Sequence, residues 1–241
     1  MATWFISDLH LNANQPALIQ QACEFLEHLP ANTDALYILG DLFEYWVGDD
    51  SLNTPYTSAL QSVFTGLQQL KQRGIPVYFQ HGNRDFILGQ AFADYTGLSL
   101  LPESVVIDLY GTPSLLMHGD TLCTDDVAYQ QARVLLRNPQ WQQQALSQPI
   151  AARIQQALAM RAQSQIHQMQ AESIVDVNQT AVIQAMQQAN VTRLIHGHTH
   201  RPAHHKFLLH DQAVNRIVLG DWHINRPSFL KIDEQHLTLN F

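Results

Sequence analysis

The chain of 241 residues has little cysteine, little positive charge and no long hydrophobic run. Its two cysteines, Cys23 and Cys123, are too few for a disulfide framework, so we expect ordinary buried thiols in a reducing compartment. The 13 lysines and arginines stand against 21 aspartates and glutamates, which gives a formal net charge of -8. This acidic balance argues against a nucleic-acid partner, because binding to a phosphate backbone requires positive charge.

The sequence also lacks the features of a membrane span and of a signal peptide. No apolar run approaches the roughly 20 residues that cross a bilayer. Residues 1–8 have no basic segment followed by a long apolar stretch. We therefore expect a cytoplasmic, monomeric protein that is still able to lie on a membrane surface. The length and a hydrophobic content of 46% predict a single domain, residues 1–241, with a sizeable core.

Short apolar segments alternate with helical segments in the first half of the chain, a pattern typical of a layered α/β fold. Helical spacing predicts helices over residues 16–29 and 56–73, with Pro16 near the start of the first and Gly74 at the end of the second. The apolar segments predict strands, of which the last two form a hairpin, over residues 3–7, 35–39, 77–80, 105–109 and 114–117.

The composition changes over residues 125–173, which are rich in Gln, Ala, Arg, Leu and Met. This segment contains no glycine, and its prolines are Pro139 and Pro149. Because these residues are strong helix formers, we predict an inserted lid of two or three helices. Beyond the insert, the pattern predicts one helix and then four strands, over residues 180–188, 193–195, 215–219, 228–232 and 237–241.

Histidine is abundant, with 13 residues, and several histidines lie in short loops beside Asp, Asn and Gly. Five of the predicted strands are followed directly by polar groups that bind metals. Because ligands collect beyond the carboxyl ends of strands in layered α/β folds, we expect these groups to converge. Carboxylate, imidazole and amide donors without thiolate suit Mn, Fe or Zn and disfavour a structural zinc cage. The five segments are Asp8-Leu9-His10, Gly40-Asp41, His81-Gly82-Asn83-Arg84-Asp85, His118-Gly119-Asp120 and His196-Gly197-His198-Thr199-His200.

This series resembles the signature motifs of the calcineurin-like metallophosphoesterases, in the expected order and over most of the chain. The resemblance implies a β-sandwich flanked by helices and a hydrolytic enzyme that uses two divalent metal ions. It also implies that Asp41 bridges two metal sites, one formed by Asp8, His10 and His200 and the other by Asn83, His118 and His198.

The same resemblance implies the catalytic roles. A water between the metals, held through Asp41, is the expected nucleophile, because metal binding lowers the pKa of water to about 7. Arg84 is expected to bind and stabilise the phosphate through its guanidinium fork, and the alternative is a plain surface ion pair. His81 and His196 are expected to orient the ligands or to support the loops.

Longer strings around these motifs resemble the bacterial UDP-2,3-diacylglucosamine pyrophosphatases, from the first residue to about Ile232. The resemblance implies cleavage of UDP-2,3-diacylglucosamine to UMP and 2,3-diacylglucosamine 1-phosphate in lipid A synthesis, with Mn²⁺ as the expected metal. The alternative is a metallophosphoesterase that acts on another phosphodiester or pyrophosphate. The matching strings are residues 1–11, 40–50, 81–86, 118–126, 196–202 and 219–222.

Contacts to the sugar and the nucleotide carry over from this family as well. For Asp126 the alternative is a carboxylate at a helix N-terminus, and Trp46 either lines the pocket or packs in the core. Gln168 and Ala171 lie nearest to the positions at which the family has polar residues and a lysine, and no lysine appears here. The carried-over contacts are Asn83, Arg84, Asp126, Ser164 and His198.

The insert supplies apolar residues for two acyl chains, although such residues also pack helices onto a core. Arg153 and Arg161 are expected to face anionic lipid heads, which places the protein peripherally on the cytoplasmic face of the inner membrane. The expected partners are therefore a lipid-linked UDP-sugar and a membrane surface. The apolar residues are Leu135, Leu136, Trp141, Leu146, Ile150, Ile154, Leu158 and Met160.

A non-catalytic binding module is the remaining alternative. A module that retained the fold without the chemistry is expected to have lost some ligands, whereas the full motif series is present here. The sequence therefore predicts an enzyme.

Overall fold

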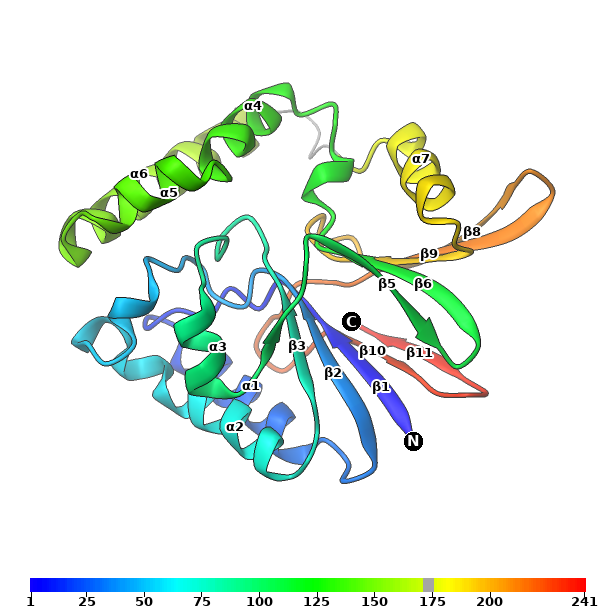
Figure 1. Ribbon diagram of the computed structural model, residues 1–241, viewed down its shortest axis with the longest axis horizontal. Helices are drawn as coiled ribbons and strands as arrows, with labels where there is room; N and C mark the ends of the chain where they lie inside the picture. Colours follow the sequence, from blue (N-terminus) through cyan, green and yellow to red (C-terminus); the bar gives the residue numbers. More distant parts are fainter. Residues whose placement is uncertain (171–175) are drawn as a thin grey trace.

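The computed structural model describes the backbone of residues 1–170 and 176–241, and the side chains of residues 1–162 and 176–241. The first of its two sheets contains parallel strands β1 to β4, with β10 and β11 added antiparallel at one edge. The carboxyl ends of β1 to β4 therefore lie along one edge (Figure 1). In spatial order, the strands are β11 (Leu237–Asn240), β10 (Phe229–Ile232), β1 (Ala2–Ile6), β2 (Thr33–Leu39), β3 (Val77–Gln80) and β4 (Ser99–Leu100).

The second sheet has a parallel centre, β6-β7-β9, and antiparallel strands at both edges. The sheets form a sandwich, because Phe5 and Leu39 of the first sheet share a buried cluster with Leu116, Ile195 and Ile217 of the second. In spatial order, the strands are β5 (Ser104–Leu109), β6 (Thr112–Met117), β7 (Arg193–His196), β9 (Gln212–Val218) and β8 (Ala203–Leu209).

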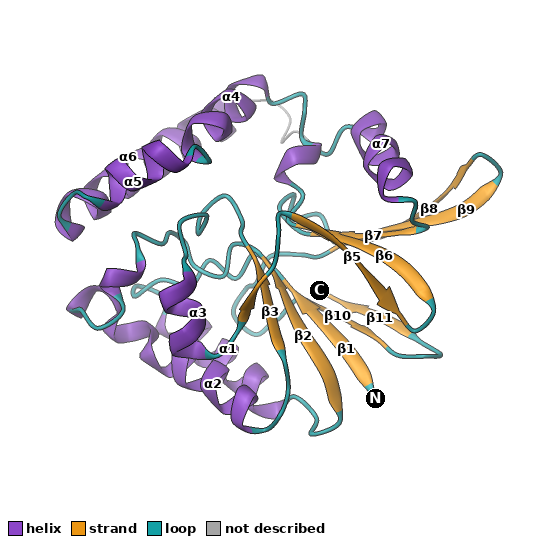
Figure 2. Ribbon diagram, in the orientation of Figure 1, coloured by secondary structure: helices purple, strands orange, loops and turns teal. Residues whose placement is uncertain are grey.

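Helices cover the outer faces of both sheets (Figure 2). On the first sheet, α1 (Pro16–His28), α2 (Gln61–Gln72) and α3 (Gln90–Thr96) bury their apolar faces in the largest hydrophobic cluster. On the second sheet, α7 (Gln179–Ala189) begins at Asn178, whose side chain accepts hydrogen bonds from two backbone N–H groups of the first turn. The result is the layered α/β arrangement that the alternating pattern predicts.

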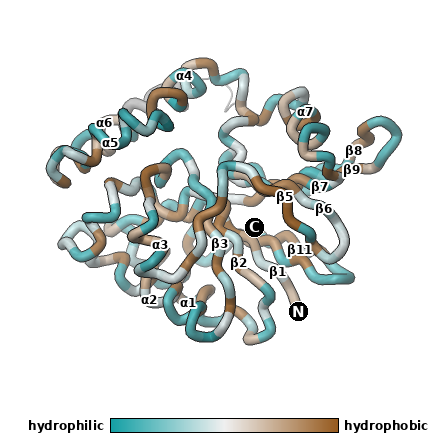
Figure 3. The backbone as a smooth tube through the Cα atoms, viewed as in Figure 1, coloured by the Kyte–Doolittle hydropathy of each residue, from teal (hydrophilic) through white to brown (hydrophobic). Residues whose placement is uncertain are grey.

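Three helices of the insert lie apart from both sheets, across from the carboxyl ends of the strands (Figure 1). They are α4 (Val127–Leu136), α5 (Pro139–Leu146) and α6 (Ile150–Gln170). Neither α4 nor α5, both fully described, contains a buried residue, and hydrophobic positions recur along the three helices in Figure 3. Among the described residues, no helix combines the length and the apolarity that crossing a bilayer requires.

The predicted end of the insert at residue 173 lies outside the described residues. We propose that the insert and the sandwich form one domain over residues 1–241, because insert arginines contact the loops of the sandwich. Arg133 pairs with Asp120, and Arg161 pairs with Glu44.

The bounds of the predicted elements agree with the structure to within about three residues, and three differences have clear physical causes. The predicted helix over residues 56–73 begins as a 3₁₀ segment, Pro55–Leu60, before α2. The helix α3 was not predicted, because its cap is not local: the carboxylate of Asp49 accepts hydrogen bonds from Gly89 N and Phe92 N, at 3.0 and 2.9 Å. The edge strand β8 was not predicted, because its residues 204–206 are exposed and polar and so give no alternation of apolar residues.

Candidate metal centre

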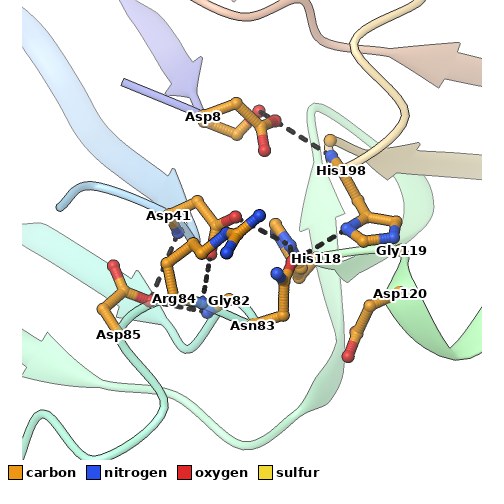
Figure 4. Close-up of polar contacts among 12 residues, drawn as sticks. Asp8, Asp41, Gly82, Asn83, Arg84, Asp85, His118, Gly119, Asp120 and His198 are labelled. Atoms are coloured by element: carbon orange, nitrogen blue, oxygen red, sulfur yellow. Dashed lines mark hydrogen bonds and ion pairs between the residues drawn. The ribbon is translucent and has the colours of Figure 1, made fainter. Parts of the chain in front are cut away.

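The loops that follow β1, β2, β3, β6 and β7 meet at one end of the sandwich (Figure 4). In the part of the chain with described side chains, two groups of at least three His, Cys, Asp or Glu residues have ligand atoms within 4.8 Å of one another. One group is Asp8, His10 and His200, and the other is Asp8, Asp41 and His118. Loops far apart in the sequence thus bring together donors that suit divalent cations.

The first group surrounds Oδ1 of Asp8. His200 Nε2 lies 3.4 Å and His10 Nε2 4.0 Å from that oxygen, and the two ring nitrogens are 3.2 Å apart. Asp41 Oδ2 lies 3.9 Å from His10 Nε2. The three residues assigned from sequence to the first metal therefore point to one spot, with Asp41 beside them.

The residues assigned from sequence to the second metal surround the amide oxygen of Asn83. His198 Nδ1 lies 2.9 Å and His118 Nε2 3.0 Å from Asn83 Oδ1 (Figure 4). Asp41 Oδ2 lies 3.7 Å from His118 Nε2, so this single oxygen faces both groups. A carboxylate in this position is able to bridge two cations, as expected from the motif series.

Asp8 and His118 are each held through one side-chain atom and direct the other toward the site. Oδ2 of Asp8 accepts hydrogen bonds from Ser7 Oγ at 2.5 Å and His198 N at 2.9 Å. His118 Nδ1 donates to Leu39 O at 2.8 Å, which directs Nε2 toward Asn83 Oδ1. Among the described residues, the buried Oδ1 of Asp8 has no hydrogen-bond partner. A buried, unpaired carboxylate oxygen surrounded by imidazoles fits a bound cation.

The pKa of Asp8 also indicates a site that fits a bound cation. Burial raises the pKa of Asp8, but the contact with His200 and the charges of His200, His118 and His10 outweigh burial and hold this pKa well below its usual value. Burial lowers the pKa of His200, but Asp8 raises it to about 9. Both shifts have the same origin: the fully buried carboxylate of Asp8 is stabilised by positive charge beside it.

Five of the predicted ligands have backbone conformations that residues with side chains seldom adopt. The φ angles of Asp8, His10, Asp41, His198 and His200 lie between 50° and 69°. Such strain of about 1 to 3 kcal/mol per residue persists where the surrounding structure imposes it, and it is concentrated at functional sites. The loops are therefore held in shape before any ligand binds.

The residues that hold the ligand loops were not predicted as site residues. Asp85 is fully buried and accepts hydrogen bonds from Leu42 N at 2.8 Å and Gly82 N at 2.9 Å, which joins the loops after β2 and β3. Glu44 Oε2 lies 3.2 Å from His10 Nδ1 and thus orients that ring. The sequence signal was their place in the strings Gly40-Asp41-Leu42-Phe43-Glu44 and Gly82-Asn83-Arg84-Asp85.

Gly82 is required by the close approach of these two loops. A Cβ atom at residue 82 lies 2.7 Å from Asp41 Cγ and closer still to Asp41 Oδ1 and N. The contact is with a fixed carboxylate and with backbone, so neither partner is able to move aside. The glycine before Asn83 therefore permits the contact that positions Asp41.

The predicted substrate residues have different surroundings. The backbone N of Arg84 donates to Asp41 Oδ1 at 2.8 Å, and among the described residues its buried Nε has no partner, so the guanidinium is available for an anion. Asp126 is the N-cap of α4 and accepts from Tyr129 N at 2.9 Å, which is the structural alternative raised from sequence. Ser164 and Gln168 lie on α6, and their side chains lie outside the described residues.

Two arginines predicted to face lipid heads point inward instead, and that prediction was wrong. Arg153 is buried and pairs with Asp50, because a helix residue facing the sandwich finds a carboxylate and carbonyl groups there. Arg161 pairs with Glu44 beside the metal centre. Trp46 is buried among aromatic core residues, its indole N–H donating to Asp49 Oδ1 at 2.9 Å, so it packs in the core.

His81 and His196 lie behind the ligands. The ring of His81 contacts Leu88 O through Nε2 at 2.6 Å, and the ring of His196 contacts Gly197 O through Nδ1 at 2.8 Å. Burial lowers the pKa of His196 to about 3, so its ring is neutral. Both histidines thus contact loop backbone next to the predicted ligands.

The fold and the arrangement of donors define the class of protein. The family model of the calcineurin-like phosphoesterases matches residues 1–202, and these residues include every donor in the two groups. The chain therefore belongs to the calcineurin-like phosphoesterase family.

Curated relatives that carry the name UDP-2,3-diacylglucosamine hydrolase define the family more narrowly. The relative from Nitrosococcus oceani is 51% identical and covers 92% of this chain and 88% of its own length. The relative from Cellvibrio japonicus is 49% identical over 92% of both chains. The relative from Serratia proteamaculans is 47% identical over 99% of this chain and 98% of its own. Because the identity is high over nearly the whole length, the chain belongs to the UDP-2,3-diacylglucosamine hydrolase family.

Among solved structures, an archaeal phosphodiesterase covers 99% of both chains with a TM-score of 0.48 and 12% identity.

Proposed function

We propose that the chain hydrolyses the pyrophosphate bond of UDP-2,3-diacylglucosamine to UMP and 2,3-diacylglucosamine 1-phosphate in lipid A biosynthesis. The observation that carries this proposal is the 47% to 51% identity to hydrolases named for that substrate. The match to the Serratia relative covers 99% of the chain and so includes the insert as well as the metal loops.

The donor set supports two divalent cations, and Mn²⁺ fits its carboxylate, imidazole and amide oxygen groups. Asp8, His10 and His200 form the first proposed site, and Asn83, His118 and His198 form the second. Asp41 is common to both. When bound, the ions supply a polarised phosphoryl group and a water whose pKa is lowered to about 7.

The protein's own residues bind and orient the pyrophosphate. The guanidinium of Arg84 is proposed to donate to phosphate oxygens, because its buried Nε has no partner among the described residues and its backbone is fixed on Asp41. Asn83, on the same loop, is proposed to contact the substrate beside it. Whichever phosphorus is attacked, the group that leaves is a phosphate monoester, which is a good leaving group, so no strong general acid is required. Electrostatic stabilisation of the phosphoryl group is therefore expected to supply most of the rate.

The insert is proposed to receive the acyl chains and to contact the inner membrane. Val134 is 75%, Leu135 57% and Leu158 49% exposed, although they lie on helices next to the metal loops. Exposed apolar residues gathered on one element are typical of a lipid or membrane contact. Asp126, Ser164 and Gln168, which lie on or next to α4 and α6, are proposed to contact the head group.

The substrate assignment is tested by comparing three compounds. The wild-type enzyme is expected to hydrolyse UDP-2,3-diacylglucosamine with a kcat/KM at least about 100-fold above that of UDP-N-acetylglucosamine, because each buried methylene contributes about 0.8 kcal/mol. Para-nitrophenyl phosphate, which has neither nucleotide nor acyl chains, serves as the control for bare metal-centre chemistry.

Equal or greater activity on either soluble compound would favour the alternative, a phosphoesterase with another substrate. The comparison should be run with the diacyl substrate in mixed detergent micelles, so that solubility does not decide the outcome.

A further inference from the structure

Four arginines of the insert contact loops of the sandwich that carry predicted metal ligands or their supports. Arg133 Nε donates to Asp120 Oδ2 at 2.8 Å, two residues beyond His118. Arg137 Nη2 donates to Gly82 O at 2.9 Å, and Arg161 Nε pairs with Glu44. The fourth, Arg153, contacts Val47 and Asp50, further along the loop after β2 that also carries Asp41.

Arg153 is the most buried of the four, with a side-chain exposure of 4%. Its Nε donates to Gln148 O at 2.9 Å, at the start of its own helix. Its Nη1 donates to Val47 O and, at 2.9 Å, to Asp50 Oδ1, while Nη2 donates to Asp50 Oδ2. The guanidinium thus makes a two-pronged contact with one carboxylate and also bonds to backbone on both sides of the interface.

The loop is shaped for this arginine. Gly48 has φ of 121°, which residues with a side chain rarely adopt. A Cβ atom at residue 48 lies 2.6 Å from Leu146 Cδ2 on α5 and closer still to Arg153 Nη1. The glycine therefore allows both the turn and the close approach of α5 and α6.

Adjacent aspartates of the same loop hold it from opposite sides. Asp49 caps α3, through Gly89 N at 3.0 Å and Phe92 N at 2.9 Å, and so fixes the loop on the sandwich. Asp50 holds Arg153 of the insert. Neither aspartate is part of the metal centre, yet both belong to the string Trp46-Val47-Gly48-Asp49-Asp50 that accompanies the metal motifs in the sequence.

We propose that Asp50 and Arg153 form an anchor that fixes the insert over the metal centre, and that both are positioning residues for the diacyl substrate. This proposal rests on the proposed function. The anchor lies near the start of α6, and Arg161 and the predicted substrate residue Ser164 lie further along the same helix. A helix transmits a shift at one end along its length, so loss of the anchor displaces the residues that meet the substrate.

The test uses Asp50→Asn and Arg153→Lys in the full-length, Mn²⁺-loaded protein. Asparagine keeps the shape of Asp50 but presents an N–H₂ group to the guanidinium, and lysine keeps the charge of Arg153 but loses the fork. Each variant is expected to raise KM for UDP-2,3-diacylglucosamine about 10-fold, which corresponds to about 1.4 kcal/mol, because it breaks the two-pronged contact between the guanidinium and the carboxylate. The double variant is expected to raise KM no further, because both changes break one contact.

Four other readouts separate positioning from general damage. The value of kcat, the Mn²⁺ affinity measured by calorimetry and the thermal midpoint are expected to stay close to wild type. Hydrogen exchange at amides of α6 is expected to accelerate in both variants and to stay unchanged in α1. The exposed Asp94→Asn on α3 is the matched control and is expected to change neither KM nor exchange.

An unchanged KM in either variant, or a double variant with additive losses, overturns the proposal if the wild type hydrolyses the diacyl substrate. If the wild type does not hydrolyse it, the proposed function fails, and exchange at α6 alone decides whether the anchor exists. Unchanged exchange at α6 overturns the anchor in either case.

Discussion

Replacing Asp41 with asparagine is expected to lower kcat by at least about 1,000-fold, which corresponds to about 4 kcal/mol of transition-state stabilisation. One oxygen of Asp41, Oδ2, faces His10 Nε2 at 3.9 Å and His118 Nε2 at 3.7 Å. This single oxygen thus lies beside one histidine of each predicted metal site. Asparagine retains the shape and the hydrogen bond from Arg84 N but removes the negative charge that the two proposed cations would share.

The fold is expected to survive this change. Burial raises the pKa of Asp85, and the charge of Asp41 raises it further, which shows that the two carboxylates repel each other. Removal of the Asp41 charge relieves this repulsion and also removes the attraction of Asp41 for His118, so the metal-free protein is expected to stay folded. Steady-state turnover and thermal unfolding measure the two effects, with Asp94→Asn as the control. Wild-type turnover in Asp41→Asn would rule out a shared carboxylate.

Replacing Gly82 with alanine is expected to have an effect of similar size by a steric route. The added Cβ lies 2.7 Å from Asp41 Cγ, closer than real Cβ contacts come, and it also meets the backbone of Asp41. Because the loops after β2 and β3 are joined here, the carboxylate has to shift and both predicted metal sites lose it. Overpacking of this kind also destabilises a fold by about 1 to 3 kcal/mol.

Gly74→Ala is the matched control for this experiment. Gly74 has φ of 75° and has open space around its Cβ position. The control is expected to lose about 1 kcal/mol of stability from its left-handed backbone conformation, with no effect on turnover. Turnover, metal binding and unfolding free energy should be measured on both variants. A Gly82→Ala enzyme that binds metal and turns over as the wild type does would refute the role assigned to this contact.

The strands and the convergence of the donors could be predicted from sequence because both depend on short continuous segments of the chain. Each apolar strand ends in a polar motif, and the parallel arrangement places such ends at one edge of a sheet. Asp8, for example, lies two residues beyond the end of β1, and His118 follows β6 directly. The approximate meeting place of these polar groups therefore required no knowledge of distant contacts, whereas their assignment as metal ligands came from the family resemblance and stays a prediction.

The features that were missed depend on residues far apart in the chain. The cap of α3 comes from Asp49, which lies 40 residues before Gly89. The prediction that Arg153 faces lipid failed because a helix pattern does not show which way a side chain points. The carboxylate partner of Arg153 lies 103 residues away in the chain. Asp85 and Glu44 act on loops that meet only in the folded chain, so their contacts are visible only in three dimensions.

These loops are proposed to hold two divalent cations between Asp8, Asp41, Asn83 and the four predicted histidine ligands. The most direct measurement is anomalous diffraction from crystals of the wild-type protein grown with Mn²⁺. Two manganese peaks are expected roughly 3.5 to 4 Å apart, with Asp41 between them. A crystal with no manganese at these loops, or with manganese bound only elsewhere on the protein, would contradict the account.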